Sequence, residues 1–145
     1  MPERPIRSLV AKQKLVTAAA ASTVFEATRL MRQAQVGAVM IVDDDGRLLG
    51  MFTERDALYR VLAEGRDPKA TSLAEVMTPH PQTITPDKPF AHALLMMHEG
   101  GFRHVPVVER GKPVGMLSAR DALGLELQEF ESEVQRRARI GEILG

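Results

Sequence analysis

The sequence predicts a mixed α/β (α+β) fold built from two pseudo-symmetric units, each of which contains helices and strands. The main observation is an internal repeat, because segment 39–58 returns in similar form as segment 105–123. The offset is 66 residues between Val39 and Val105 and 65 between Thr53 and Ser118, so one copy has an extra turn residue. Short β-branched runs and apolar residues at helical spacing alternate within each copy. A duplicated unit of this size buries a shared face against its twin and leaves a symmetric cleft between the copies.

Each copy is predicted to begin with a short introductory turn of helix and to continue through an extended segment into an amphipathic helix. The introductory turns fall at Ile6 to Val10 and at Leu73 to Met77, whose apolar residues match. Helical spacing of apolar residues predicts the longer helices from about Val24 to Gln33 and from about Phe90 to Glu99. Gly100-Gly101 ends the second of these, because glycine enters the left-handed conformation at low cost.

Two short strands follow in each copy. The runs Val39 to Val42 and Val105 to Val108 are apolar and mostly β-branched, which predicts strands buried on both faces. The chain then reverses at Asp43 to Gly46 and at Glu109 to Gly111. The returning strands are predicted at Leu48 to Phe52 and at Pro113 to Leu117.

Each copy closes with a helix whose first turn carries a capping pattern. Thr53 and Ser118 are each followed three positions later by an aspartate, Asp56 or Asp121, which supplies an acceptor for unpaired amides. The first of these helices is expected to end at about Ala63, near Gly65. The second is expected to be longer, because an apolar stripe continues through Leu123, Leu127, Phe130 and Val134. The predicted divisions are a first unit at 6–65, a second unit at 72–128 and a C-terminal helical extension at 129–145.

Composition narrows the classes of function. The 145 residues suffice for one compact domain or two closely packed halves, and they include no cysteine, which excludes disulfides and thiolate metal sites. Lysine plus arginine equals aspartate plus glutamate at 19 each, so nucleic acid is not expected to be the main partner. We see neither a secretory signal nor an apolar run of the ~20 residues that cross a bilayer, and we expect a soluble, cytoplasmic protein without membrane contact.

The repeated motif resembles that of a known family. Gly50-Met51-Phe52-Thr53-Glu54-Arg55-Asp56 and Gly115-Met116-Leu117-Ser118-Ala119-Arg120-Asp121 each end a strand and open a helix, and 102–108 supplies the preceding strand. Together they resemble a tandem pair of CBS domains, the cystathionine-β-synthase-type regulatory module, over about 6–127. The resemblance implies two β-α-β-β-α units packed through their sheets, a free-standing pair (a Bateman module) and a homodimeric disc. It also implies that adenine-containing ligands bind in the clefts between units and that the fold brings no catalytic apparatus.

The resemblance gives the two aspartates a role. Asp56 and Asp121 are the candidates for ribose recognition, because a carboxylate accepts hydrogen bonds from two adjacent hydroxyls. Thr53 and Ser118 stand one turn earlier, where a hydroxyl and free amides at a helix start can contact a ribose or phosphate oxygen. Simple helix capping explains the same four residues, and the spacing alone does not separate the two interpretations.

Basic residues next to the second copy's first strand are candidates for phosphate binding. Arg103 and His104 occupy the place where similar modules carry basic residues, whereas the first copy has Gly37-Ala38 there. We therefore expect the two clefts to differ, with the Arg103 side better suited to a phosphorylated ligand and the other side weaker, empty or specific for an uncharged adenosine moiety. Arg55 and Arg120 are alternative phosphate contacts. A solvated arginine and a partly buried histidine remain the alternative interpretation.

An adenine ring needs a flat apolar slot. The residues at positions that could line it are Val36, Met51, Phe102 and Met116. Packing of methionine in the core explains Met51 and Met116 equally well.

The leading hypothesis is a regulatory module that binds AMP, ADP, ATP or another adenosyl ligand, senses metabolite or energy state and modulates a partner protein. The alternative is a ligand-independent module for dimerisation or interaction. His80, His92 and His98 lack metal-ligand spacing, and the sequence has no nucleophile motif. We therefore expect no metal centre, no cofactor apart from the regulatory nucleotide, and no enzyme activity.

Overall fold

The computed structural model describes residues 5–144, and the side chains of 123–131 and 142–144 lie outside that description. The first half of the chain contains α1 (Ile6–Val10), β1 (Thr17–Ala19), α2 (Val24–Ala34), β2 (Ala38–Val42), β3 (Leu48–Thr53), α3 (Glu54–Asp56) and the π-helical turn η1 (Ala57–Leu62). The second half contains α4 (Leu73–Val76), β4 (Thr78–Pro79), α5 (Phe90–Gly100), β5 (His104–Glu109), β6 (Lys112–Ser118) and α6 (Ala119–Leu144).

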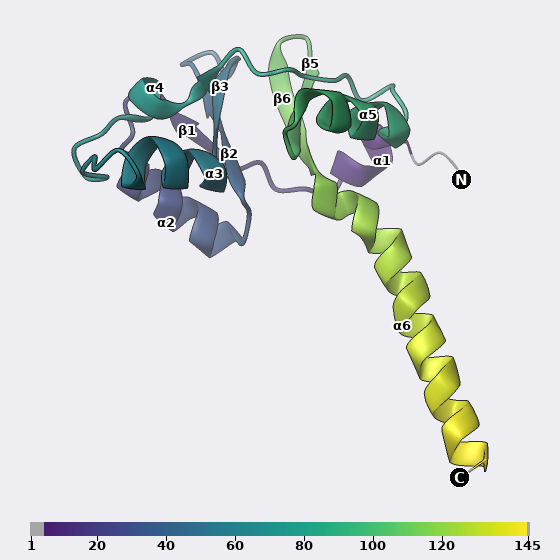
Figure 1. Ribbon diagram of the computed structural model, residues 1–145. Coiled ribbons are helices and arrows are strands. Elements are labelled where there is room, and N and C mark those ends of the chain that lie inside the picture. Colours follow the sequence, from purple (N-terminus) through teal and green to yellow (C-terminus); the bar gives the residue numbers. More distant parts are fainter. Residues whose placement is uncertain (1–4, 145) are drawn as a thin grey trace.

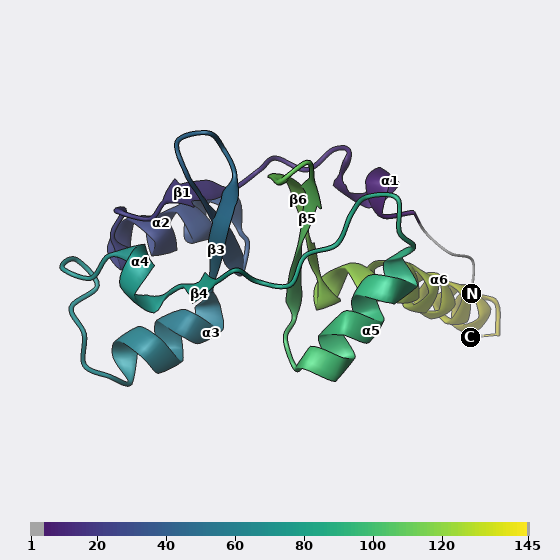
Figure 2. The same cartoon turned by 90° about the horizontal axis from the view of Figure 1, so that it is seen from above.

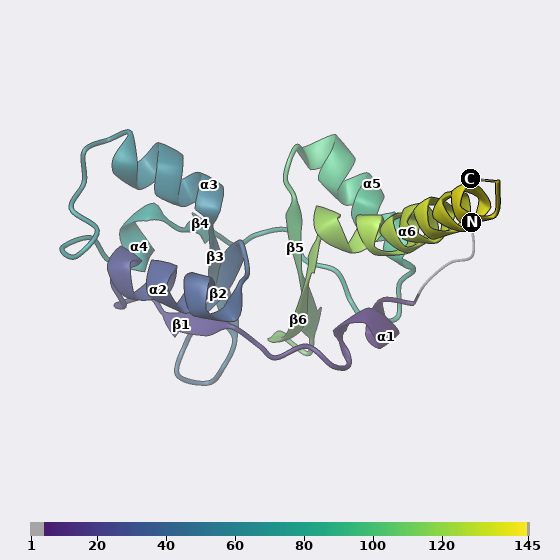
Figure 3. The same ribbon diagram turned by 90° about the horizontal axis from the view of Figure 1, so that it is seen from below.

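The strands form two sheets that lie between the helices (Figures 2 and 3). The first sheet has the order β1-β2-β3-β4, in which β1 runs parallel to β2 and the other pairs are antiparallel. The second sheet is the antiparallel pair β5-β6, which runs in register from His104 opposite Ser118 to Glu109 opposite Lys112. The expected mixed architecture of helices and strands in two related halves is confirmed.

The extended segment that opens the second unit differs from its twin. In the first unit this segment is strand β1, whereas in the second it forms only a single parallel bridge between Ile84 and Val107. Ile84 donates through its amide to Pro106 and accepts from the amide of Val108, at 3.1 and 2.9 Å. Pro81 and Pro86 flank the bridge, and proline has no N–H to continue a ladder. In the second unit, the first strand of the implied β-α-β-β-α order is therefore reduced to one bridge.

The two amphipathic helices agree with the prediction to within a residue. Thr23 begins α2 with a capping box, since its hydroxyl accepts from the amide of Glu26 at 3.1 Å and its own amide donates to the Glu26 carboxylate at 3.2 Å. Val24, Ala27 and Met31 form the buried face of α2. At the end of α5, Gly101 has a φ of 71°, the left-handed conformation expected there.

The short introductory helices are exchanged between the units. Ile6 and Val10 of α1 belong to the core of the second unit, together with Phe90, Val105 and Leu117. Conversely, Leu73 and Val76 of α4 belong to the core of the first unit, together with Val24, Val39, Ile41 and Phe52. The sequence repeats and the packed cores therefore have different boundaries.

The repeated glycines allow this exchange. A Cβ at Gly115 would lie 2.5 Å from Cβ of Val10 in α1, and a Cβ at Gly50 would lie 2.5 Å from Sδ of Met77, next to α4. Neither contact is sterically possible, so each motif glycine makes room for the segment that crosses over from the other unit.

The crossing segments also complete the sheet edges. In the first unit β4 pairs with β3, with Thr78 opposite Met51. In the second unit the side chain of Gln13 takes this place, because its amide nitrogen donates to the Met116 carbonyl and its oxygen accepts from the Met116 amide, both at 2.9 Å. A side-chain amide thus imitates a backbone strand on the edge of β6.

Helix α6 leaves the body of the protein and projects away from it (Figure 1). It is continuous from Ala119 to Leu144, and its main contacts with the rest of the fold are to α5 and β6. Among the described helices, none is both long and apolar enough to cross a membrane.

Candidate functional site

A cleft of about 980 Å³ lies between the two units. The first unit contributes the segment before β1, the end of α2, the start of β2 and Glu54. The second unit contributes the junctions that begin β5 and α6. The lining residues are Gln13, Lys14, Leu15, Val16, Thr17, Leu30, Gln33, Ala34, Gln35, Val36, Gly37, Ala38, Met40, Glu54, Arg103, His104, Met116, Ser118, Ala119, Arg120 and Asp121.

Asp121 and Ser118 line this cleft at the start of α6. The amide of Ser118 donates to Oδ2 of Asp121 at 2.8 Å, and the Ser118 hydroxyl lies 3.5 Å from the same oxygen. Asp121 therefore caps the helix and also faces the cleft, so the two interpretations of this residue are compatible. A carboxylate, a hydroxyl and the amides of a helix start are brought to one edge of the hollow.

The cleft carries charges of both signs. Lys14, Arg103 and Arg120 bring three cationic side chains, and Glu54 and Asp121 bring two carboxylates. The backbone anchors two of these positions, since the Arg103 carbonyl accepts from the amide of Ala119 at 2.9 Å. In the repeat-related position, the Gly37 carbonyl accepts from the amide of Glu54, also at 2.9 Å.

His104 is partly buried at the centre of these charges. Burial lowers the pKa of its imidazole, since the charged form loses its hydration. The carboxylates of Glu54 and Asp121 act in the opposite direction, while Arg103 and Arg120 act in the same direction as burial. The net lowering of the pKa favours the neutral ring in the folded protein.

Gly37 is the point where the two units approach each other. A Cβ at this position would lie 2.9 Å from Oε1 of Glu54 and 3.4 Å from Nε2 of His104. A side chain at this position would therefore require the carboxylate of Glu54 to move.

An apolar wall faces the charged groups. Leu15 and Val36 are 44% and 40% exposed although both are large apolar residues. They line the cleft together with Val16, Met40 and Met116. Apolar side chains that stay accessible in a hollow form the kind of surface on which a flat ring packs.

A second hollow of about 590 Å³ adjoins this cleft. Gln35, Val36, Gly37, Glu54 and Arg120 line both hollows. The smaller one extends toward α2, where Arg32 adds a further cation.

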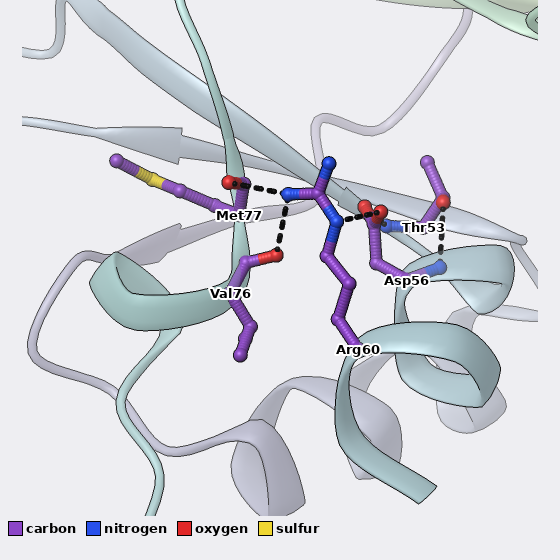
Figure 4. Close-up of polar contacts among 5 residues, drawn as sticks. All are labelled: Thr53, Asp56, Arg60, Val76 and Met77. Carbon is purple, nitrogen blue, oxygen red and sulfur yellow. Dashed lines mark hydrogen bonds and ion pairs between the residues drawn. The ribbon is translucent and has the colours of Figure 1, made fainter. Parts of the chain in front are cut away.

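Asp56, the repeat counterpart of Asp121, does not line the cleft. Figure 4 shows its carboxylate engaged inside the first unit. Oδ2 accepts from the amide of Thr53 at 3.0 Å, Oδ1 lies 3.5 Å from Nε of Arg60, and the hydroxyl of Thr53 accepts from the amide of Asp56 at 3.2 Å. Arg60 also donates to the carbonyls of Val76 and Met77, at 3.2 and 3.0 Å. Asp56 and Thr53 therefore form a complete capping box, and Arg60 links it to the end of α4.

Three further candidates lie outside this cleft. Met51 is buried in β3, and Phe102 packs against the core of the second unit. Arg55 places its guanidinium carbon 5.5 Å from the centre of the Tyr59 ring, which is a cation–π contact. The candidates that line the cleft are Val36, Gly37, Arg103, His104, Met116, Ser118, Arg120 and Asp121.

Sequence reasoning missed the segment 13–17 and Glu54. The segment leads into β1 and includes its first residue, Thr17, and its exposed Leu15 contrasts with the buried residues of β2. Its position between the introductory turn and the first strand was a usable signal, because the cleft lies between repeats. In the part of the chain that the structure describes, no group of three or more histidine, aspartate or glutamate residues could hold a metal ion.

Comparison with known proteins identifies relatives of the chain. The family model described as CBS domain matches residues 6–63 and 73–127. The chain is 35% identical over 134 residues to the CBS domain-containing protein CBSCBSPB2 of Arabidopsis thaliana, covering 92% of this chain and 25% of that protein. It is 33% identical over 118 residues to the mitochondrial protein CBSX3 of the same plant, covering 79% and 57%. The chain thus spans between a quarter and somewhat over half of the length of these relatives.

Solved structures share the fold. The CBS-domain containing protein ATU1752 from Agrobacterium tumefaciens superposes with a TM-score of 0.74 at 31% identity, covering 82% of this chain and 90% of that one. The CBS domain pair of protein MJ0100, in complex with 5′-methylthioadenosine and S-adenosyl-L-methionine, superposes with a TM-score of 0.72 at 26% identity, covering 79% and 92%.

Proposed function

Because this chain belongs to the CBS-domain family as a tandem pair, we propose that it is a regulatory module that binds an adenosyl ligand in the cleft at the start of α6. One observation carries the proposal. A single hollow is lined by the acidic residue Asp121, by the basic residues Arg103 and Arg120, and by an apolar wall that includes Leu15 and Val36. These are the groups needed for a ribose, a phosphate and an aromatic base.

Each part of the ligand has a matching part of the cleft. Asp121 accepts from the two ribose hydroxyls, which favours a ribonucleoside over a deoxyribonucleoside. Arg103 and Arg120 contact the phosphate through forked donors. The apolar wall packs against adenine. The complex of the MJ0100 pair with two adenosyl compounds supports this class of ligand.

The proposed stoichiometry is one ligand per chain. Asp121 lines the cleft, whereas Asp56 does not line it and has Nε of Arg60 at 3.5 Å from its carboxylate. A ligand at Asp56 would have to displace Arg60, which would cost the hydrogen bonds that Arg60 makes to Val76 and Met77.

The ligand acts by regulation. Ligand binding stabilises the arrangement of the two units that it contacts, and this change alters the activity of a partner protein. The proposal includes a homodimer, a cytoplasmic location, no cofactor beyond the regulatory nucleotide and no catalytic activity.

Calorimetric titration of AMP, ADP, ATP, S-adenosylmethionine and NADH into the full chain tests the proposal. We expect one site per chain and a 10- to 100-fold weaker affinity in the Asp121→Ala variant, since a hydrogen bond to a charged group contributes about 1.5–3 kcal/mol. Arg103→Ala should weaken binding of the phosphorylated ligands more than binding of S-adenosylmethionine. Asp56→Ala is the matched control and should bind as the wild type does. Undiminished binding in both Asp121→Ala and Arg103→Ala would contradict the site assignment.

A ligand-independent interaction module is the second candidate function, and exposed apolar residues favour it. Leu58, Tyr59 and Leu62 on η1 and Leu95 on α5 are all more than half exposed. The helices that carry them lie on the same side of the sheets (Figures 2 and 3). Thermal-shift measurements separate the two functions, because a ligand at 100 times its Kd stabilises the fold by about 2.7 kcal/mol. If no adenine compound raises Tm, the interaction module is favoured.

A further inference from the structure

The outer part of α6 is almost entirely exposed in the part of the chain that the structure describes. Within 132–141 every side chain except Glu133 is exposed, and the apolar residues Val134 and Ile140 are 49% and 48% exposed. Because most helical stability in proteins comes from packing of an apolar face, this exposed segment would gain stability from a partner surface. Figure 1 shows this part of the helix projecting away from the body of the protein.

The charges of this segment are separated along its axis. Residues 126–133 carry four glutamates and no basic residue, namely Glu126, Glu129, Glu131 and Glu133. The next turn carries Arg136, Arg137 and Arg139 and no acidic residue. Within one helix only neighbouring groups meet, as in the ion pairs of Glu133 with Arg136 and Arg137. Two such helices that run antiparallel about Val134 place Glu129 opposite Arg139 and Glu131 opposite Arg137, while Glu126 stands opposite Glu142.

The sizes of the apolar residues also suit an antiparallel pair of helices. Residues 127, 130, 134, 138 and 141 recur at spacings of three and four, which places them on one helix face. They are bulky before Val134, as Leu127 and Phe130, and small after it, as Ala138 and Gly141. In an antiparallel pair centred on Val134, position 130 stands opposite 138 and position 127 opposite 141. Large residues then face small ones throughout, which allows close approach of the helices.

We propose that two copies of this chain pair through α6 as antiparallel helices, with the twofold axis at Val134. A parallel pair would place glutamate beside glutamate and arginine beside arginine, which disfavours it. The partner of α6 is a second copy of the chain, because the charges and the side-chain sizes of one α6 match those of another α6 that runs in the opposite direction. This inference specifies the contact of the proposed dimer and does not depend on nucleotide binding.

Disulfide trapping in the full chain tests the geometry, since the natural sequence has no cysteine. In the Val134→Cys variant the two thiols meet on the axis, and we expect a covalent dimer under mild oxidation. In the Gly141→Cys variant the two thiols are 14 residues apart along the pair, about 21 Å, beyond the ~7 Å limit between the α-carbons of a disulfide. This variant should therefore stay monomeric on a denaturing gel. A mixture of Leu127→Cys and Gly141→Cys chains should form a mixed dimer.

Absence of the Val134→Cys dimer, or self-linking of Gly141→Cys, would overturn the proposal. Charge exchange gives an independent measurement by sedimentation. We expect loss of self-association through α6 in the triple variant Arg136→Glu, Arg137→Glu, Arg139→Glu and in the triple variant Glu126→Lys, Glu129→Lys, Glu131→Lys. A mixture of the two triple variants should associate again. If the wild type sediments as a dimer and the trapping fails, the α6 contact is wrong while the dimer and the nucleotide proposals stand.

Discussion

Asp56 and Asp121 occupy the same position of the repeat, but their carboxylates have different neighbours. Arg60, one helical turn after Asp56, reaches back to its carboxylate at 3.5 Å. The residue one turn after Asp121 is Leu125, so the second unit has no cation at the equivalent position. Arg60 in the first unit and Leu125 in the second are therefore one difference between the surroundings of the two aspartates.

The lowered pKa of His104 makes the stability of the fold depend on pH. Its folded pKa is lowered, so below about pH 6.5 the unfolded chain binds more protons at this residue than the folded chain does. Stability contributed by the neutral ring is thus present above pH 6.5 and decreases as pH falls below it. We expect His104→Asn to reduce this decrease, measured by denaturant unfolding between pH 5 and 8. The control His92→Asn, at an exposed position of α5, should keep the wild-type profile; an identical loss in all three proteins would contradict the assignment.

At the scale of single elements, the motif glycines have a packing role that the sequence did not reveal. Gly115→Ala brings a Cβ to 2.5 Å from Cβ of Val10, an atom fixed to the backbone of α1. Either α1 or β6 must move, so we expect a destabilisation of about 1–3 kcal/mol in denaturant unfolding. Gly141→Ala, measured at protein concentrations too low for self-association through α6, is the control, because nothing of its own chain lies within 4 Å of its added Cβ. In a helix this change should stabilise by about 0.5–1 kcal/mol, and an equal loss in both variants would refute the steric explanation.

Local patterns predicted most of the elements. Capping residues and apolar spacing located α2 and α5 to within a residue, since these signals come from neighbours in the chain. Strands β2 and β5 were predicted by their β-branched residues for the same reason. The loss of the strand at Ile84 and the strand-like side chain of Gln13 were not predicted, because both depend on which segments meet in space.

The candidate cleft was also predicted only in part, because some of its features depend on which segments meet in space. The repeat indicated a hollow between the units and the residues at the starts of β5 and α6 that line it. It did not indicate that Arg60 engages Asp56, nor that the segment 13–17 closes one side of the cleft. Those facts depend on side-chain reach and on the path of a linker, and a repeat pattern contains neither.

At the scale of the whole molecule, the exchanged helices link the stability of each unit to the other end of the chain. Ile6 is fully buried in the core of the second unit. Ile6→Ala should therefore cost about 2–5 kcal/mol and raise amide hydrogen exchange in β5 and β6 more than in β2 and β3. Leu73→Ala should produce the opposite pattern, because Leu73 is buried in the first core. Faster exchange of β2 and β3 in the Ile6→Ala variant would contradict the assignment of α1 to the second core.

The exchange also sets the order in which the protein can be completed on the ribosome. Ile6 and Val10 are translated more than a hundred residues before Leu117, the last strand residue of the core that they enter. Helix α1 must therefore wait, with its apolar side unprotected, until β6 has left the exit tunnel. The core of the first unit is complete once α4 has been translated. The nascent chain therefore finishes its first unit before the second, and α1 docks last.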